Sequence, residues 1–264
     1  MEEYIDSSLK SWIEVRETKL NGHEYVISVV SLPFKEYKDF EQPKDLTQLK
    51  LLSYLSDKKI DALFTEPEFI SEAEARNLAL KPLLDNKCDI VLLVDADEIY
   101  TINNIRNIAD FIQRDGGSTA WFSICLKNYV FDDKTYLLDP FTPPRVFRTY
   151  YNNTYVLKSF EWDNDPFYER VDRQVNDLLK YEFDTTGKIS YKQLSSMQIP
   201  QNITYINHYS WLSNNKSRDK IRYQTTHFRG QCSFKWNEIE NKLEFNELYY
   251  RSLGQFTPFL GRDQ

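Results

Sequence analysis

Residues 90 to 98 read Ile-Val-Leu-Leu-Val-Asp-Ala-Asp-Glu, an apolar run that ends in three carboxylates within four residues. The five apolar residues, rich in Val and Ile and preceded by a polar stretch, predict a strand that is buried on both faces, as in a parallel sheet covered by helices. The carboxylates then fall at the carboxyl end of the strand, where ligands collect in open α/β sheets. The stretch therefore predicts an α/β fold with a charged site at the end of this strand.

Helices are expected on both sides of this strand. Residues 71 to 80 begin with Ser71 and carry Glu74 three residues later, the pattern of a helix cap, and continue with Ala, Leu and Glu. Residues 103 to 113 place isoleucines at helical spacing before Asp115-Gly116-Gly117 ends the segment. The order helix, strand, helix fits the α/β class.

Further elements are expected on either side of this unit. Residues 24–32 and 60–64 read as the first and second strands, and residues 46–55 read as a helix between them. Residues 1–22 are either a leading helix or an addition to the domain. A further strand is expected over 202–206 and a helix over 172–181, within a second half of the chain that is less regular.

The carboxylates of Asp95 and Asp97 suggest a cation site. Side chains alternate along extended backbone, so both carboxylates would project to the same side of the chain. Two carboxylates on one side repel each other unless a positive charge lies between them, and hard oxygen ligands suit Mg²⁺ or Mn²⁺. The alternative is an ordinary solvated turn at a strand end.

Three patches in this order resemble family 2-like glycosyltransferases of the GT-A fold. The first covers Glu72 to Tyr100, where an Arg-Asn pair opens a helix and the next strand delivers an Asp-x-Asp motif. The second is Pro144-Arg145-Val146-Phe147-Arg148, and the third is Ile206-Asn207-His208-Tyr209, followed by Lys216 and Lys220. The resemblance implies a GT-A fold, with a Rossmann-like, mostly parallel central sheet flanked by helices.

The resemblance also implies an activity and a set of site residues. The activity is transfer of a sugar from a nucleotide-diphosphate donor, a UDP-sugar first among them, to an acceptor hydroxyl, with inversion favoured. A divalent cation, Mn²⁺ or Mg²⁺, would be held by Asp95, Asp97 and His208. The donor would be bound by Arg76, Asn77, Asp95 and Lys220.

The catalytic base implied by the resemblance is a carboxylate after the Asp-x-Asp motif. Residues 160–170 offer Glu161, Asp163, Asp165 and Glu169, and relatives often carry a His-Glu pair near this point, which this chain lacks. Tyr168-Glu169 is the nearest match, so Glu169 is the first choice and Asp163 the second. A solvated acidic loop is the alternative. Thr65-Glu66-Pro67-Glu68 stands where relatives carry an Asp cluster that helps to hold the nucleobase, so the base of the donor stays open.

Two of the implied residues have simpler interpretations. Arg76, early in a helix, could be a solvated residue that is paired with Glu72. His208, beside aromatic residues, could be a hydrogen-bonded core or surface residue rather than a ligand. Both interpretations stay open on the sequence alone.

The composition limits the partners. A net charge of −7 argues against a surface that tracks nucleic-acid phosphates, and three widely spaced cysteines without a Cys-x-x-Cys pattern suggest neither a disulfide framework nor a zinc site. No apolar run has the length of a membrane span, so a cytoplasmic location is expected. We expect a single GT-A-like domain over 1–264, with the donor and metal half over about 20–140 and the acceptor half over about 141–264.

Two other function classes remain as alternatives. A non-catalytic sugar- or nucleotide-binding module could keep the same fold, and it would not release nucleotide from a donor. A phosphohydrolase of the haloacid dehalogenase type also ends a strand in Asp-x-Asp, but its motif sits near the start of the domain and continues with different residues than Glu98-Ile99.

Overall fold

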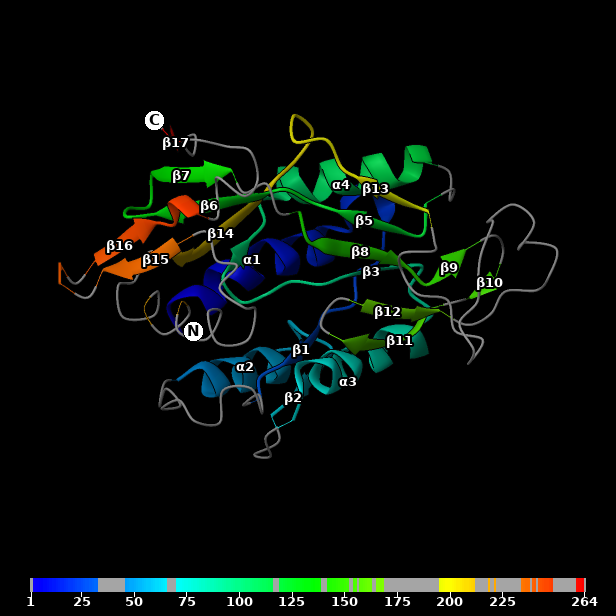
Figure 1. The fold of residues 1–264 in the computed structure, drawn as a ribbon. Coiled ribbons are helices and arrows are strands. Elements are labelled where there is room, and N and C mark those ends of the chain that lie inside the picture. The colour runs from blue at the N-terminus through cyan, green and yellow to red at the C-terminus, as the bar shows by residue number, and fades with distance from the viewer. Residues whose placement is uncertain are drawn as a thin grey trace.

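A computed structural model describes most of the chain (Figure 1). The described residues are 2–32, 46–65, 70–115, 119–138, 142–151, 154–155, 157–162, 165–168, 195–211, 218, 221, 234–237, 239–240, 242–248 and 260–263. The helix expected over 172–181 lies outside them. The helices are α1 (Glu2–Thr18), α2 (Thr47–Ser56), α3 (Glu72–Asp85) and α4 (Ile102–Asp115), with a short 3-10 turn η1 (Leu20–Gly22) after α1.

The strands form two larger sheets and several pairs. The four-stranded sheet has the order β13 (Ser196–Gln198), β5 (Trp121–Ser123), β8 (Pro144–Arg148) and β3 (Ile90–Leu92). The five-stranded sheet has the order β17 (Leu260–Arg262), β7 (Thr135–Leu138), β6 (Leu126–Val130), β14 (Ile206–Trp211) and β4 (Glu98–Ile99). The pairs are β1 (Ser28–Val30) with β2 (Ala62–Phe64), β9 (Tyr150–Tyr151) with β10 (Thr154–Tyr155), β11 (Leu157–Trp162) with β12 (Asp165–Tyr168), and β15 (Phe234–Asn237) with β16 (Lys242–Phe245).

The four-stranded sheet confirms the expected α/β class. Strands β3 and β5 both run antiparallel to β8, and β13 runs parallel to β5, so three of the four strands point the same way and β8 is the exception. Helices α4 and α3 lie on opposite sides of this sheet (Figure 1). Strand β8 lies beyond residue 141 yet sits between β3 and β5, so the two halves of the chain interleave in one sheet.

Alternating side chains explain why β3 is apolar throughout. Val91 joins a buried cluster with Leu80 of α3 and with Phe147 of β8. Ile90 and Leu92 point the other way, into a cluster that contains Ile105 and Ile108 of α4 and Val15 of α1. Each face of the strand is covered by helix, as the sequence predicts.

Local signals place the helices next to the strand. Ser71 caps α3 in a reciprocal box, because its side chain accepts a hydrogen bond from the Glu74 backbone at 3.2 Å and its own N–H donates to the Glu74 carboxylate at 2.7 Å. Thr101 and Asn104 form a similar pair before α4, at 2.9 and 3.1 Å. Both expected helices are confirmed, each a few residues longer than the sequence indicates.

The N-terminal elements are also confirmed. Helix α2 forms where a helix is expected over 46–55, and α1 fits the leading helix that is one of the two expectations for residues 1–22. Strands β1 and β2 pair in parallel, although β1 covers only part of residues 24–32. Ile5 and Leu9 of α1 pack with Leu51 of α2 and Ile60 in a separate buried cluster.

The prediction of a strand over residues 202–206 is wrong. Residues 201–203 form a turn rather than strand, because the N–H groups of Ile203 and Thr204 donate to the Pro200 carbonyl at 2.8 and 3.2 Å. The strand begins only at Ile206 and continues to Trp211, so His208 lies inside β14 and not at a strand end. There, β14 pairs in parallel with β6 and antiparallel with β4.

In the part of the chain that the structure describes, no helix combines the length and the apolar character that a membrane crossing requires.

Candidate functional site

The acidic motif lies on a turn, not on extended backbone. Strand β3 ends at Leu92, Ala96 and Asp97 form a turn, and the Glu98 N–H donates to the Asp95 carbonyl at 2.9 Å. The alternation of side chains that is expected from the sequence holds only along extended backbone, so it does not apply between Asp95 and Asp97, because Ala96 and Asp97 form a turn. Asp95 and Asp97 instead contact different partners.

Arg145 of β8 holds one side of this turn. Its Nη2 lies 2.7 Å from Asp95 Oδ2 and 2.6 Å from Glu98 Oε1, and its Nε donates to the same Glu98 oxygen at 3.0 Å. Burial alone would lower the pKa of Arg145, but Glu98 and Asp95 raise it above its ordinary value. Arg145 is therefore a permanent buried cation that fixes the geometry of the turn.

Glu98 is the most buried carboxylate of the motif, with 0% of the residue exposed. Burial raises its pKa, although the charge of Arg145 opposes the rise. The Tyr100 hydroxyl lies 3.5 Å from the second carboxylate oxygen, and Ser8 of α1 donates to the Glu98 carbonyl at 3.1 Å. Glu98 thus belongs to the support of the site rather than to its open surface.

Arg76 of α3 reaches the same cluster from the other side. Its Nη2 pairs with Glu72 Oε1 at 2.5 Å and approaches Asp95 Oδ1 to 3.5 Å. Burial alone would raise the pKa of Asp95, but Arg145 and Arg76 outweigh it and lower the pKa below its ordinary value. Arg76 is therefore paired with Glu72 within its helix, as the simpler interpretation expects. It is also a neighbour of the Asp-x-Asp motif, as the glycosyltransferase resemblance implies.

Asp97 and His208 come together on the other side of the turn. His208 stands opposite Glu98 in the β14–β4 register, and its Nε2 lies 3.6 Å from Asp97 Oδ2. The Tyr209 N–H donates to the Asp97 carbonyl at 2.9 Å and ties the turn to β14. The imidazole Nδ1 contacts the Oδ1 of Asn128, a buried residue of β6.

The contact with Asn128 has a consequence for the tautomer. An amide oxygen only accepts hydrogen bonds, so Nδ1 carries a proton that it donates to Asn128, and Nε2 is the nitrogen that faces Asp97. A carboxylate oxygen and an imidazole nitrogen facing each other across 3.6 Å are placed as two ligands of one cation would be.

The three expected metal ligands do not form one group. Among the described residues, no cluster of three or more His, Cys, Asp or Glu side chains is arranged to hold a metal. Asp97 and His208 fit such an ion as a pair, whereas Asp95 is turned toward Arg145 and Arg76. A pair is still compatible with Mg²⁺ or Mn²⁺, because such ions are commonly held by one or two protein ligands together with substrate phosphates and water.

Asn77 has a structural partner. Its amide donates to the Phe160 carbonyl at 2.7 Å and accepts from the Phe160 N–H at 2.6 Å, so it joins α3 to β11. Its part in donor binding stays a prediction. Lys220, Asp163 and Glu169, the remaining expected site residues, lie outside the described residues.

Arg145, Glu98 and Asn128 are the site residues that sequence reasoning did not select. Arg145 and Glu98 stand inside the quoted motifs, so the signal was present, but their pairing depends on β8 lying beside β3. Asn128 carries no local signal, since only the alignment of β6 with β14 brings it opposite His208.

The fold and site together define an α/β protein with a charged site where the motif turn after β3 meets β14. The chain matches no protein-family model and no curated protein sequence. Among solved structures it is similar to S. aureus TarS 1-349 in complex with UDP, with 14% identity over 96% of this chain and 67% of that chain and a TM-score of 0.40. It is also similar to S. aureus TarS 1-349 in complex with UDP-GlcNAc, with 13% identity over 87% of this chain and 72% of that chain and a TM-score of 0.36.

A third similar structure, of S. aureus TarS, is 14% identical over 91% of this chain, with a TM-score of 0.40, and this chain spans only 39% of it. Likeness this remote carries no argument about activity, so the function has to be argued from the side chains.

Proposed function

We propose that this chain is a metal-dependent glycosyltransferase of the GT-A type that uses a nucleotide-diphosphate sugar as donor. The observation that carries the proposal is the pairing of Asp97 with His208, 3.6 Å apart on a turn that buried Arg145 holds in place. Two ligands at the end of an α/β sheet, with an arginine close by, suit a diphosphate and its cation.

The charges around the turn support a bound cation. Asp95 and Glu98 pair with Arg145, Arg76 pairs with Glu72 and approaches Asp95, and Asp97 lies beside His208. The four carboxylates therefore outnumber the two arginines. Arg145 and Arg76 hold Asp95 in its ionised form. A divalent cation beside Asp97 would offset the excess negative charge and offer a binding point for phosphate oxygens.

Each residue of the site has a distinct role in the proposed reaction. Asp97 and His208 would hold Mn²⁺ or Mg²⁺, which when bound neutralises negative charge on the diphosphate leaving group as a Lewis acid. Asp95 and Arg145 orient the turn. Arg76 would bind the donor diphosphate after its ion pair with Glu72 breaks. Asn128 accepts a hydrogen bond from Nδ1 of His208 and so keeps Nε2 directed toward Asp97.

The acceptor side of the proposal rests on the resemblance alone. Glu169, or Asp163 in second place, would take the proton of the acceptor hydroxyl in an inverting transfer. Lys220 would approach the donor phosphates. Glu169→Gln should then abolish transfer while leaving donor binding intact, a separation that a loss of folding would not produce.

A thermal-unfolding screen tests the proposal. UDP-, GDP-, CMP- and dTDP-sugars, UDP-GlcNAc among them, are added with and without Mn²⁺ to the wild type and to Asp97→Ala. A donor present at about one hundred times its dissociation constant stabilises the folded state by about 2.7 kcal/mol. We expect one donor to raise the melting temperature only when Mn²⁺ is present, and we expect the variant to lose this response.

The control is Glu24→Ala, which removes a carboxylate whose side chain is 82% exposed and remote from the turn, and which should respond as the wild type does. Release of free nucleotide in the absence of acceptor separates a transferase from a non-catalytic binding module. No response to any donor would contradict the proposal and favour the phosphohydrolase.

A further inference from the structure

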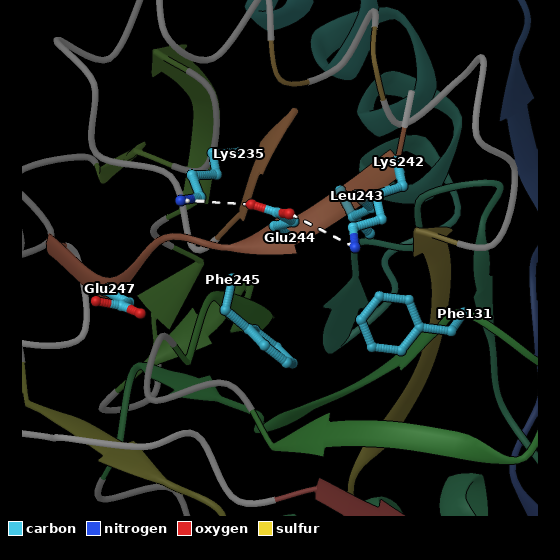
Figure 2. A pocket seen from close by; sticks show the side chains of 7 residues that line it. All are labelled: Phe131, Lys235, Lys242, Leu243, Glu244, Phe245 and Glu247. Atoms are coloured by element: carbon cyan, nitrogen blue, oxygen red, sulfur yellow. Dashed lines mark ion pairs between the residues drawn. The ribbon is translucent and has the colours of Figure 1, made fainter. Parts of the chain in front are cut away.

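A groove of about 540 Å³ lies between the β15–β16 hairpin and the turn that joins β6 to β7 (Figure 2). It lies apart from the Asp-x-Asp turn, and among the described residues none of the expected site residues lines it. Two phenylalanine rings, Phe131 and Phe245, face it from one side, and Lys235, Glu244 and Lys242 form a row along the other (Figure 2).

Phe131 is held in an unfavourable conformation at the lip of this groove. Its φ is 69°, and the Asp132 N–H donates to the Val130 carbonyl at 2.8 Å, so Phe131 is the centre of a γ-turn with positive φ. A non-glycine residue in such a turn is strained, and 52% of Phe131 is nevertheless exposed to solvent. Strain at an exposed apolar residue does not stabilise the fold, and strained residues cluster at ligand-binding sites.

The two rings present an open aromatic surface. Phe131 and Phe245 meet edge to face, with centroids 5.8 Å apart and planes at 86°. Beside this contact, 52% of Phe131 stays exposed to solvent. An exposed phenyl face is the surface on which the C–H groups of a pyranose ring pack, as apolar atoms do on other aromatic side chains.

The polar row opposite the rings offers both donors and acceptors of hydrogen bonds. Glu244 lies 3.5 Å from Lys235 and 3.8 Å from Lys242, Lys242 also pairs with Glu240, and Glu247 adds a second carboxylate to the lining. Ammonium groups donate and carboxylates accept, so together they can serve both sides of a hydroxyl group. The lysines carry no excess positive charge over these carboxylates, so the row suits a neutral, hydroxyl-rich ligand better than an anion.

Packing ties the groove firmly to the strand that carries His208. Phe245 contacts Phe234 at 5.5 Å between centroids, and Phe234 contacts Trp211 of β14 at 4.5 Å. Trp211 is three residues beyond His208 on one strand, a separation of about 10 Å along extended backbone. The groove and the Asp97–His208 pair are therefore joined through β14.

We propose that this groove binds a neutral saccharide unit of the acceptor, stacked on Phe131 and hydrogen-bonded to the Lys235–Glu244–Lys242 row. The assignment rests on the proposed glycosyltransferase function, because it is that activity which makes a bound saccharide an acceptor. The groove would hold the acceptor chain while its terminal hydroxyl lies near the site at the turn.

Saturation-transfer NMR with neutral glucan, xylan and chitin oligosaccharides tests the proposal on the full chain. We expect at least one series to bind the wild type, with the affinity reduced at least about tenfold in Phe131→Gly and retained in Phe131→Tyr. Glycine adopts positive φ without strain, so Phe131→Gly should melt at or above the wild-type temperature. A loss of binding without a loss of stability separates the role of the ring from a role in folding.

Ile239→Ala is the matched control, since Ile239 is 97% exposed on the same hairpin and does not line the groove. It should bind saccharide as the wild type does. Absence of binding to every series, or binding that Phe131→Gly leaves unchanged, would overturn the proposal. So would self-association that Phe131→Gly abolishes, because the groove would then be an interface between copies.

Donor binding in the same variants distinguishes the two proposals. Nucleotide-sugar stabilisation that persists in Phe131→Gly, with saccharide binding lost, supports both. Saccharide binding without any donor response leaves the groove in place and contradicts the glycosyltransferase function.

Discussion

Arg145 is the residue of the site on which the geometry of the turn depends most. It is 5% exposed and neutralises Glu98, which is fully buried, while it also orients Asp95. A buried ion pair adds little stability compared with an apolar pair of similar size, but loss of one partner leaves an uncompensated buried charge. The arrangement therefore favours a single geometry of the turn more than it favours stability.

Substitution of Arg145 by methionine should lower the free energy of unfolding by about 3–5 kcal/mol, measured by urea denaturation at neutral pH. The deficit should shrink as the pH falls. Burial raises the pKa of Glu98, and without Arg145 it rises further. A carboxyl whose folded-state pKa is raised stabilises the folded state at low pH, and this contribution is lost as the pH rises through that pKa.

The double variant Arg145→Met with Glu98→Leu is the control. It removes both buried charges and should recover most of the lost stability, whereas a double variant as unstable as the single one would show that Arg145 acts through Asp95 instead.

The residues of the site were easier to predict from sequence than their partners. Asp95, Asp97 and His208 were expected to share one cation, but Asp95 pairs with Arg145 and Arg76 while Asp97 lies beside His208. Backbone alternation was the wrong guide there, because β3 ends at Leu92 and a turn follows at Ala96 and Asp97. Pairings such as Asp97 with His208 depend on strand neighbours that no local pattern specifies.

At the scale of elements, the Ser71–Glu74 box anchors the start of α3, the helix that carries Arg76. Substitution of Ser71 by alanine should lower the free energy of unfolding by about 1 kcal/mol, because the Glu74 N–H loses its acceptor. Chemical denaturation checks this. Ser71→Gly, which keeps a favourable cap conformation, should cost only a few tenths of a kcal/mol. Equal losses in both variants would argue against the cap.

Elements with strong local signals were predictable, and short ones were not. Helices α3 and α4 have caps and periodic apolar residues, and β3 is an uninterrupted apolar run. Residues 202–206 have the composition of a strand, yet the Pro200 carbonyl captures two of their N–H groups and the strand starts later. Strand β4 has two residues, and only its pairing with β14 makes it a strand.

At the scale of the whole molecule, an ion pair between Lys127 of β6 and Asp263, the residue after β17, links the edge strand β17 to the five-stranded sheet. Lys127 is 5% exposed, pairs with both carboxylate oxygens of Asp263 at 2.6 and 2.8 Å, and lies 4.0 Å from the centre of the Tyr136 ring. Burial alone would raise the pKa of Asp263, but Lys127 and Tyr129 outweigh it and lower the pKa. This contact joins residues 136 positions apart.

Asp263→Ala should lower the free energy of unfolding by about 1–3 kcal/mol, because a buried ammonium loses its charged partner and keeps only aromatic neighbours. Denaturant titration measures the loss. Arg262→Ala, at a neighbouring position whose side chain is 72% exposed, is the control and should be nearly neutral. Equal stability of both variants with the wild type would show that the Lys127–Asp263 ion pair does not stabilise the fold.

The α/β class was predictable from residues 71–113 alone, since one helix, strand, helix unit specifies it. The interleaving of β8 and β14 with earlier strands was not, because contacts such as Arg145 with Glu98 and His208 with Asn128 leave no periodic trace in the sequence.

We propose that Asp97 and His208 bind a divalent cation together with a nucleoside diphosphate. Electron paramagnetic resonance of Mn²⁺ is the decisive measurement, because the signal of the free aqueous ion falls as the ion binds. We expect UDP and wild-type protein together to remove the free signal, and Asp97→Ala to restore it while Glu24→Ala does not. Equal Mn²⁺ binding by the wild type and Asp97→Ala in the presence of UDP would show that Asp97 is not a ligand of the cation.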